Sequence, residues 1–292
     1  MTRLCRASLF VVVLLLAGCG RTEDTAPPVA TPSVTLQRSA VPIGSPLQMK
    51  YQFTVAASDP AFAQDYWVFV HFLDRDGELM WTDDHRPPTP TERWKAGDTI
   101  EYARTMFVPK FPYTGPTTVE VGLFSPKTGQ RLPMTGQTRG QRSYEVAKFD
   151  LELQSANQFV VFKQGWHPAE VADDQIGTEW QWSKKEATLT FRNPKKDVLF
   201  YLELDRPAAP FPEPQQVEIR VGEEVVDHFA LGSHEHQLRK FPLSSAQLGT
   251  ADTVEMRIVV DRTFTPANVP SMSSRDPREL GVRVFRAYVE PR

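Results

Sequence analysis

Short segments of alternating apolar and polar residues constrain this chain most strongly. Residues 47–55 (LQMKYQFTV) alternate with a period of two, which is typical of a half-buried strand. Residues 65–73 (DYWVFVHFL) are apolar on both faces and predict a central strand, and Asp74-Arg75-Asp76-Gly77 predicts a hairpin turn after it. No long helical period interrupts such segments, so an all-β fold is expected.

The same pattern returns in the second half of the chain. Residues 187–191 alternate, residues 198–204 read as a buried strand, and Gly222-Glu223-Glu224 predicts a hairpin between 217–221 and 225–229. Residues 254–260 alternate again, and a final strand is expected over 280–289. We therefore predict two consecutive antiparallel β-sandwich domains of immunoglobulin-like or jelly-roll type, at 34–148 and 149–292.

The N-terminus carries the signature of an exported protein. Arg3 and Arg6 precede an apolar run over 9–17 that is far shorter than the roughly 20 residues of a membrane-spanning helix. We expect a signal peptide over 1–18. Leu16-Ala17-Gly18-Cys19 resembles a bacterial lipobox, and the resemblance implies diacylglycerol on the Cys19 thiol, cleavage before it and acylation of the new terminus. An ordinary secreted protein is the alternative.

The resemblance also implies where the chain resides. Two or three acyl chains hold a protein firmly at a membrane, whereas one binds only marginally. The residue after Cys19 is Gly20 and not Asp, which by the sorting rule of enteric bacteria favours the outer membrane. Residues 19–33 are polar and proline-rich, so a flexible tether is expected there. A membrane is thus one expected partner.

Composition excludes one class of function. The formal net charge is −3, and removal of Arg3 and Arg6 with the signal would make it more negative, which argues against a nucleic-acid partner. The chain has two cysteines, of which Cys5 would leave with the signal and Cys19 would be acylated. The folded part should therefore be stabilised by its core, without disulfides.

Two stretches resemble known protein modules. "VFVHFLDRDGELMWTDDHRPP", "PTERWKAGDTI" and "VEVGLFSPKTGQRLP" resemble β-sandwich modules attached to bacterial membrane glycosyltransferases of the dolichyl-phosphate-mannose type. "GWHPAE", "WQW", "ATLTF" and "RELGVRVFRAYVE" resemble jelly-roll carbohydrate-binding modules. These resemblances imply the fold. They do not imply glycosyl transfer, because the multi-span catalytic part of such enzymes is absent from this sequence.

Motifs for catalysis and metal binding are missing. The sequence has no Gly-x-Ser-x-Gly, no His-Glu-x-x-His, no phosphate-binding glycine loop and no cysteine pair for zinc. His234-Glu235-His236 would place two imidazoles on one face of a strand, but no third ligand is evident. We expect no metal, no cofactor and no catalytic residue. Asp and Glu are abundant, so a carboxylate pair assembled by the fold stays open as an alternative.

Aromatic residues give the best indication of a ligand site. The candidates lie in or beside turn-rich segments and combine indole rings with hydrogen-bonding groups, as sugar recognition requires. They are Trp81, Asp83, Asp84, His85, Trp94, Trp180 and Trp182. The alternative is that the tryptophans plug the ends of the sandwiches, and Trp166 is assigned that role.

Three functions are compatible with these features. The first is a lipid-anchored, non-catalytic envelope protein that binds a glycan or a protein partner in surface-polysaccharide or envelope assembly. The second is a structural or assembly lipoprotein without a small ligand. The third is a glycoside hydrolase whose acid pair forms only in the folded chain.

Overall fold

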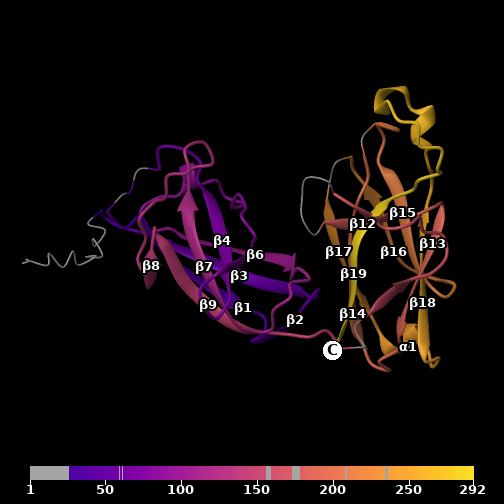
Figure 1. The fold of residues 1–292 in the computed structure, drawn as a ribbon, viewed down its shortest axis with the longest axis horizontal. Coiled ribbons are helices and arrows are strands. Elements are labelled where there is room, and N and C mark those ends of the chain that lie inside the picture. The colour runs from indigo at the N-terminus through magenta and orange to yellow at the C-terminus, as the bar shows by residue number, and fades with distance from the viewer. Residues whose placement is uncertain are drawn as a thin grey trace, which may run out of the picture.

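The computed structural model describes residues 26–58, 60, 62–155, 159–172, 178–207, 209–233 and 236–292. These residues form two antiparallel β-sandwiches in sequence, as predicted (Figure 1). The signal peptide expected over 1–18 and the acylated Cys19 lie outside the described residues.

The described residues of the N-terminal sandwich form nine strands and a short 3₁₀ helix. They are β1 (Ala30–Leu36), β2 (Ala40–Pro42), β3 (Pro46–Val55), β4 (Trp67–Leu73), β5 (Leu79–Thr82), η1 (Thr91–Arg93), β6 (Thr99–Phe107), β7 (Gly115–Phe124), β8 (Thr138–Gly140) and β9 (Ser143–Glu152).

The C-terminal sandwich contains ten strands and three short helices among its described residues. They are β10 (Val160–Phe162), β11 (Glu170–Val171), β12 (Glu179–Trp182), β13 (Glu186–Arg192), β14 (Val198–Asp205), β15 (Gln215–Val221), β16 (Glu224–Leu231), β17 (Gln237–Leu243), α1 (Ser245–Leu248), β18 (Thr253–Val260), η3 (Pro266–Asn268), η4 (Pro270–Met272) and β19 (Arg283–Pro291).

In the N-terminal sandwich, the sheet β1-β3-β6 packs on the sheet β2-β9-β7-β4-β5, to which β8 adds beside β9. The alternation predicted from the sequence is confirmed in β3, where Leu47, Met49, Tyr51 and Phe53 are fully buried. These side chains share one face of the pleated strand and form the core with the inward residues of β4 and β7. The sheets are antiparallel apart from the parallel pair β2 and β9.

In the C-terminal sandwich, the sheet β10-β13-β18-β15-β16 faces the sheet β11-β12-β19-β14-β17. Buried residues of β13, β15 and β18 alternate with polar ones, so one face of that sheet is solvated. Strand β14 is buried along almost its whole length. Its inner face lies in the core of this sandwich. Its outer face contacts the N-terminal sandwich through Leu199 and Tyr201.

Two predicted boundaries need correction. The tether expected over 19–33 ends earlier, because Ala30 begins β1, pairs with Val55 and is 1% exposed. The boundary expected between residues 148 and 149 falls inside β9, which continues to Glu152 beside β7 and β2. Both segments alternate between buried and exposed residues, with one face of each strand packed on the core, so they belong to the sandwich and not to a linker.

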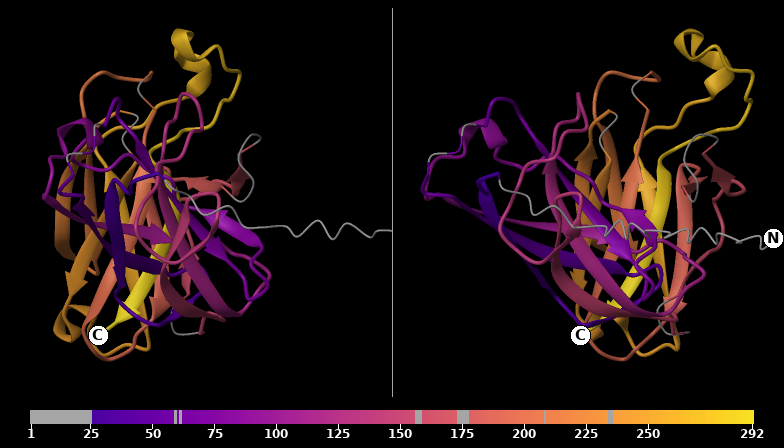
Figure 2. Two further views of the ribbon diagram at one scale, coloured as in Figure 1. Left: turned by 90° about the vertical axis from the view of Figure 1, so that its left-hand side faces the viewer. Right: turned by 60° about the vertical axis from the view of Figure 1, so that its left-hand side comes forward.

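The two sandwiches contact each other through the outer face of the sheet that contains β14 and β19. Phe107 at the end of β6 packs against Leu199, Tyr201 and Tyr288. The Arg38 guanidinium lies 2.8 Å from Glu290, whose other carboxylate oxygen accepts a 2.7 Å hydrogen bond from the Tyr201 hydroxyl. Figures 1 and 2 show the N-terminal sandwich beside this sheet, with the C-terminus of the chain at the lower end of the junction.

The helices formed by the described residues are few and short. The helix α1 spans four residues and begins with a capping box, in which Ser244 and Gln247 satisfy each other's backbone amides. Among the residues that the structure describes, no helix has the length and apolar character needed to cross a bilayer.

Candidate functional site

The tryptophans predicted in the N-terminal sandwich lie in its core. Trp81 is 8% exposed and stacks on Phe72, with ring centroids 4.7 Å apart. Trp94 is 4% exposed, packs against Phe53 and Phe62, and donates from Nε1 to the Thr89 carbonyl at 2.9 Å. Because neighbouring side chains cover both rings, neither offers a face to a sugar in this conformation. The geometry supports the packing alternative for these two residues.

Asp83 and His85 belong to a buried polar network. His85 Nδ1 lies 2.8 Å from the Asp83 carbonyl, and Nε2 lies 2.8 Å from the Tyr102 hydroxyl. Asp83 also accepts two hydrogen bonds, of 2.7 and 2.8 Å, from Arg104. Burial lowers the pKa of His85, so a neutral ring that donates to the carbonyl and accepts from Tyr102 fits this network. The network ties the segment after β5 to β6 across the edge of the sandwich.

Asp84 points to the other side of the chain from Asp83, as expected for neighbours in extended backbone. Its Oδ1 accepts a 3.0 Å hydrogen bond from the Val70 amide. The predicted residues of the N-terminal sandwich therefore do not line one groove. Among the described residues, their hydrogen bonds and ring contacts are with neighbours in the same sandwich and not with Trp180 or Trp182. A ligand role for Asp83, Asp84 and His85 stays a prediction.

The two remaining tryptophans differ in exposure. Trp182 is 7% exposed and packs edge-on against Phe264, with ring centroids 5.7 Å apart. Trp180 is only half-buried and lies on the outer face of the sheet, where its ring centroid is 6.1 Å from that of Phe285. Among the described residues, Trp180 Nε1 has no hydrogen-bond acceptor.

We call the surface formed by Trp180, Phe285, His236, Arg283 and Glu203 the aromatic face. The Arg283 guanidinium lies 5.3 Å from the Trp180 ring centroid and 5.4 Å from that of Phe285. Asp205 fixes this guanidinium through two 2.7 Å hydrogen bonds. A planar cation clamped at this distance from the rings is held by cation–π attraction and by its fork geometry.

His236 forms the outer side of the aromatic face. Its ring stacks on Phe285 at 4.4 Å with an interplanar angle of 27°, and about half of its side chain is exposed. Nε2 lies 2.9 Å from a Glu203 oxygen, and this hydrogen bond raises the pKa of His236. Glu203 also lies 3.6 Å from Arg286. The carboxylate therefore contacts two basic groups at the edge of the rings.

The N-terminal sandwich borders this surface. Arg286 Nη1 donates to the Phe107 carbonyl at 3.1 Å while its Nε faces Glu203. Lys110 and Glu179, the residue before Trp180, form an exposed ion pair at 3.3 Å. Figure 1 shows β12, β14, β17 and β19 on the side of their sandwich that faces the N-terminal one. The aromatic face thus lies at the junction of two domains, a common place for ligand sites.

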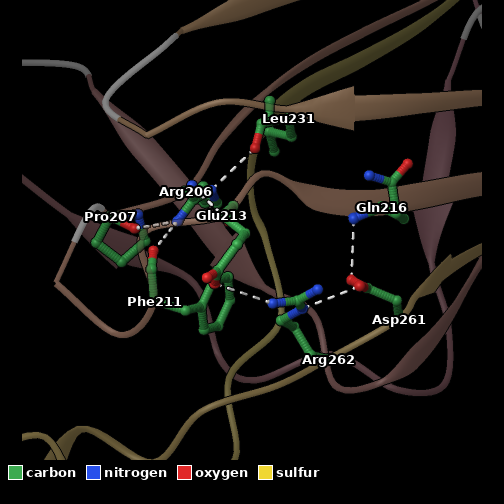
Figure 3. A network of polar contacts seen from close by, with 8 residues as sticks. All are labelled: Arg206, Pro207, Phe211, Glu213, Gln216, Leu231, Asp261 and Arg262. Carbon is green, nitrogen blue, oxygen red and sulfur yellow. Dashed lines mark hydrogen bonds and ion pairs between the residues drawn. The ribbon is translucent and has the colours of Figure 1, made fainter.

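Arg206 fixes the end of β14 beneath this surface. Its side chain is 1% exposed and donates to the carbonyls of Leu231, Pro207, Phe211 and Glu213 at 2.9–3.2 Å (Figure 3). The guanidinium also lies 5.0 Å from the Phe211 ring. Since Arg206 follows Asp205 directly, this buried anchor helps hold the carboxylate that orients Arg283.

A groove of about 440 Å³ lies on the open face of β1, β3 and β6. Tyr102 is the aromatic residue among those that line it, and its ring stacks on Tyr51 at 5.0 Å while its hydroxyl contacts His85. Lys50 and Glu101 form an exposed ion pair there. The groove therefore provides no stacking platform comparable to the aromatic face.

The sequence-based site prediction contained Trp180 and missed its partners. In the sequence, His236 stands out only as half of a metal pair, and Arg283 and Phe285 only as part of the stretch RELGVRVFRAYVE. The pairing of β12, β14, β17 and β19 brings these residues together with Glu203. His234 and Glu235 lie outside the described residues. Within the described part, no three His, Cys, Asp or Glu side chains gather as metal ligands.

Comparisons with known proteins yield no family. No model of a protein family matches the chain, and no curated protein matches it. Similar solved structures include the alkylpurine DNA glycosylase AlkC of Pseudomonas fluorescens bound to DNA containing an abasic-site analogue, at 15% identity and a TM-score of 0.27, over 42% of this chain and 30% of that one.

Two further similar structures contain carbohydrate-binding modules. One is described as a carbohydrate-binding module of the β-sandwich superfamily with promiscuous specificity, at 10% identity and a TM-score of 0.24, over 90% of this chain and 99% of that one. The other is the tandem CBM22 pair of Xyn10C from Paenibacillus barcinonensis, at 9% identity and a TM-score of 0.26, over 86% and 80%. The function proposed below rests on the residues of this chain.

Proposed function

We propose that this chain is a lipid-anchored, non-catalytic protein of the cell envelope that binds a glycan through the aromatic face. The observation that carries the proposal is the pair of partly exposed rings, Trp180 and Phe285, surrounded by fixed charged groups. The glycan would serve surface-polysaccharide or envelope assembly.

The aromatic face has the parts that sugar recognition needs. The C–H face of a pyranose packs on an indole or phenyl ring, and its hydroxyls take hydrogen bonds from groups at the ring's edge. Here Glu203 supplies acceptors, while Arg283 and His236 supply donors. Asp205 and the stack on Phe285 hold these donors in place, so little side-chain entropy is lost when a ligand binds.

Binding fits these residues better than glycoside hydrolysis. Glu203 and Asp205 lie two residues apart on the outer face of β14, which places two carboxylates on one surface. A glycosidase needs one of its pair protonated as a general acid. Asp205 is held by Arg283, and Glu203 contacts His236 and Arg286, so both carboxylates already have basic partners and neither is placed as a free acid for a glycosidic oxygen.

Replacing Trp180 by alanine tests the binding site. We expect the affinity for the best oligosaccharide found on a glycan array to fall at least tenfold, which is about 1.4 kcal/mol, because the stacking surface is lost. Trp180→Phe should retain part of the affinity. Titration calorimetry on the folded variants measures both.

Trp67→Ala is the matched control, since Trp67 is also partly exposed at 38% but lies on β4 of the other sandwich. Equal losses in the Trp67 and Trp180 variants, or no array signal from the wild type, would contradict the proposal. A protein that co-purifies in the absence of any glycan signal would instead favour the structural lipoprotein.

The lipid anchor is supported by Leu16-Ala17-Gly18-Cys19 and has a separate test. In a bacterial host, Cys19→Ser is expected to abolish acylation and leave an uncleaved precursor, because the thiol is the acceptor of the diacylglycerol. Mass spectrometry of the mature N-terminus and fractionation of the two membranes report the outcome. A Cys19→Ser protein that is processed and membrane-bound like the wild type would refute the anchor.

A further inference from the structure

A second polar pocket lies on the outer face of the N-terminal sandwich, remote from the aromatic face. It is formed by β4, β7 and the turn between β8 and β9, and has a volume of about 240 Å³. We call it the His71 pocket after the residue at its floor. Its volume is below the roughly 300–1,000 Å³ that drug-sized ligands fill, so it suits one small ring.

Glu120 is the buried acid of the His71 pocket. It lies on the central strand β7, directly opposite His71 of β4, and is 4% exposed. Its Oε2 accepts a 2.6 Å hydrogen bond from the Ser143 hydroxyl. Its Oε1 is also buried and has no hydrogen-bond donor among the described residues. A buried carboxylate oxygen without a donor is costly, which indicates that a ligand or water supplies one.

Two guanidinium groups line the same pocket. Arg139 Nε lies 3.7 Å from Glu120 Oε1, beyond hydrogen-bond distance, and its side chain is about half exposed. The Arg131 guanidinium lies 4.1 Å from the Phe69 ring centroid and donates from Nη1 to the Gln141 carbonyl at 3.0 Å. Arg131 is therefore fixed on two sides.

Gly122 makes room for that arrangement. A Cβ at this position would lie 2.2 Å from the Phe69 ring, so only glycine lets the ring lie on β7 beneath Arg131. The turn that forms the pocket wall is also unusual. Gln141 and Arg142 both have left-handed backbone angles, with φ of 51° and 54°. Non-glycine residues adopt this conformation at a cost and are held there by their surroundings.

His71 adds a neutral polar group. Burial is the main cause that lowers the pKa of His71, and Arg131 lowers it further, while Asp84 and Glu120 act in the opposite direction. A neutral imidazole has one donor and one acceptor nitrogen. The ring contacts Phe69, with centroids 4.7 Å apart.

We propose that the His71 pocket binds a single sugar residue through adjacent hydroxyl groups. A hydroxyl beside the pair can accept from Arg139 and donate to Glu120 Oε1 at the same time, and so bridge two groups that lie 3.7 Å apart. A second hydroxyl would meet His71 or Arg131. A simple cation is disfavoured by the two arginines, and a simple dianion is disfavoured by Glu120, whereas a polyhydroxylated ring satisfies all of these groups.

This inference does not depend on the aromatic face. The two sites lie on different sandwiches and use different residues, so a variant in one should leave the other intact. The His71 pocket would hold one ring or a chain end, while the open aromatic face would hold a longer stretch of glycan.

Saturation-transfer NMR with methyl glucoside, methyl galactoside and methyl glucuronide tests the proposal on the folded chain. We expect at least one probe to bind with a Kd near 1 mM, typical of a few hydrogen bonds to one ring. Glu120→Gln should weaken binding at least tenfold, because it replaces the acceptor that faces Arg139. Arg139→Met should have a similar effect, and its half-exposed position makes it the variant that keeps the fold.

The matched controls are Lys50→Met, a basic residue on the other sheet that pairs only with exposed Glu101 among the described residues, and Trp180→Ala. Both should bind the probes like the wild type. A stronger response from the glucuronide would assign an acidic sugar, and equal responses would assign neutral hydroxyls. The proposal is refuted if no probe binds the wild type, if neither pocket variant weakens binding, or if only Trp180→Ala does.

Discussion

Arg206→Met is expected to lower the free energy of unfolding of the C-terminal sandwich by about 3–5 kcal/mol, because several buried carbonyls each lose a hydrogen-bond donor at a cost of about 1–3 kcal/mol. Methionine fills most of the volume but donates no hydrogen bond. The carbonyls of Leu231, Phe211 and Glu213 would lose a donor at a place that water reaches poorly. Burial is the main cause that lowers the pKa of Arg206, and the nearby Arg262 lowers it further, while Asp261 and Glu213 act in the opposite direction.

Urea unfolding followed by tryptophan fluorescence measures the effect. With a slope of about 1–3 kcal/mol per molar urea, the midpoint should fall by about 1–5 M. Arg262→Met is the control, because Arg262 also lies near the Phe211 ring but is 40% exposed and should change the midpoint little. A shift equal to that of the control would show that the buried guanidinium does not organise this loop.

Arg206→Lys distinguishes charge from geometry. Lysine keeps the positive charge, but its ammonium is a compact point charge that cannot reach four carbonyls spread around a planar guanidinium. We therefore expect most of the loss seen with methionine. Full recovery by lysine would mean that charge alone, and not the fork of donors, stabilises the end of β14.

Gly165→Ala should lower the free energy of unfolding by about 3 kcal/mol or more, an effect comparable to that of Arg206→Met. Gly165 has a φ of +79°, where an L-residue pays roughly 1–2 kcal/mol. Its Cβ would also lie 2.0 Å from the Glu186 carbonyl oxygen and 2.7 Å from the Ala187 Cα. Both contacts are with the backbone of β13, so relief requires moving a central strand against a close-packed core.

Gly222→Ala is the matched control for this substitution. Gly222 has a similar positive φ of +58°, but an added Cβ there meets no atom within 4 Å. The Gly222→Ala variant should therefore lose only about 1–2 kcal/mol of unfolding free energy, which is the cost of a left-handed backbone conformation for an L-residue. Thermal or urea unfolding of both variants separates the two contributions. Equal losses of unfolding free energy in the two alanine variants would show that β13 can shift away from the added Cβ with little loss of stability.

The strands were largely predictable because their signal is local. In residues 47–55, every second side chain is apolar, and a pleated strand turns these side chains to one face whatever its neighbours are. The turn at Asp74–Gly77 was predictable for the same reason. Gly77 has a φ of +86°, and the Asp74 carboxylate accepts from the amides of Asp76 and Glu78.

The exposure of the tryptophans was not predictable from the chain alone. Trp81, Trp94 and Trp180 all lie near polar, turn-rich sequence, yet two are buried and one is partly exposed. Local sequence does not reveal whether a partner ring will cover an indole. Phe72 and Phe53 cover the first two because the sheets of the N-terminal sandwich close over them.

The sequence by itself determined that the chain is all-β, that it forms two units and where most strands lie, because the strand period and the turn residues act within a few positions. Only the tertiary structure decided which side chains meet. In β19 a bulge opposite Glu203 and Leu204 puts both Phe285 and Arg286 on the outer face, which breaks the alternation that a sequence pattern assumes. Likewise, Glu120 faces His71 only because β7 pairs with β4 in one register.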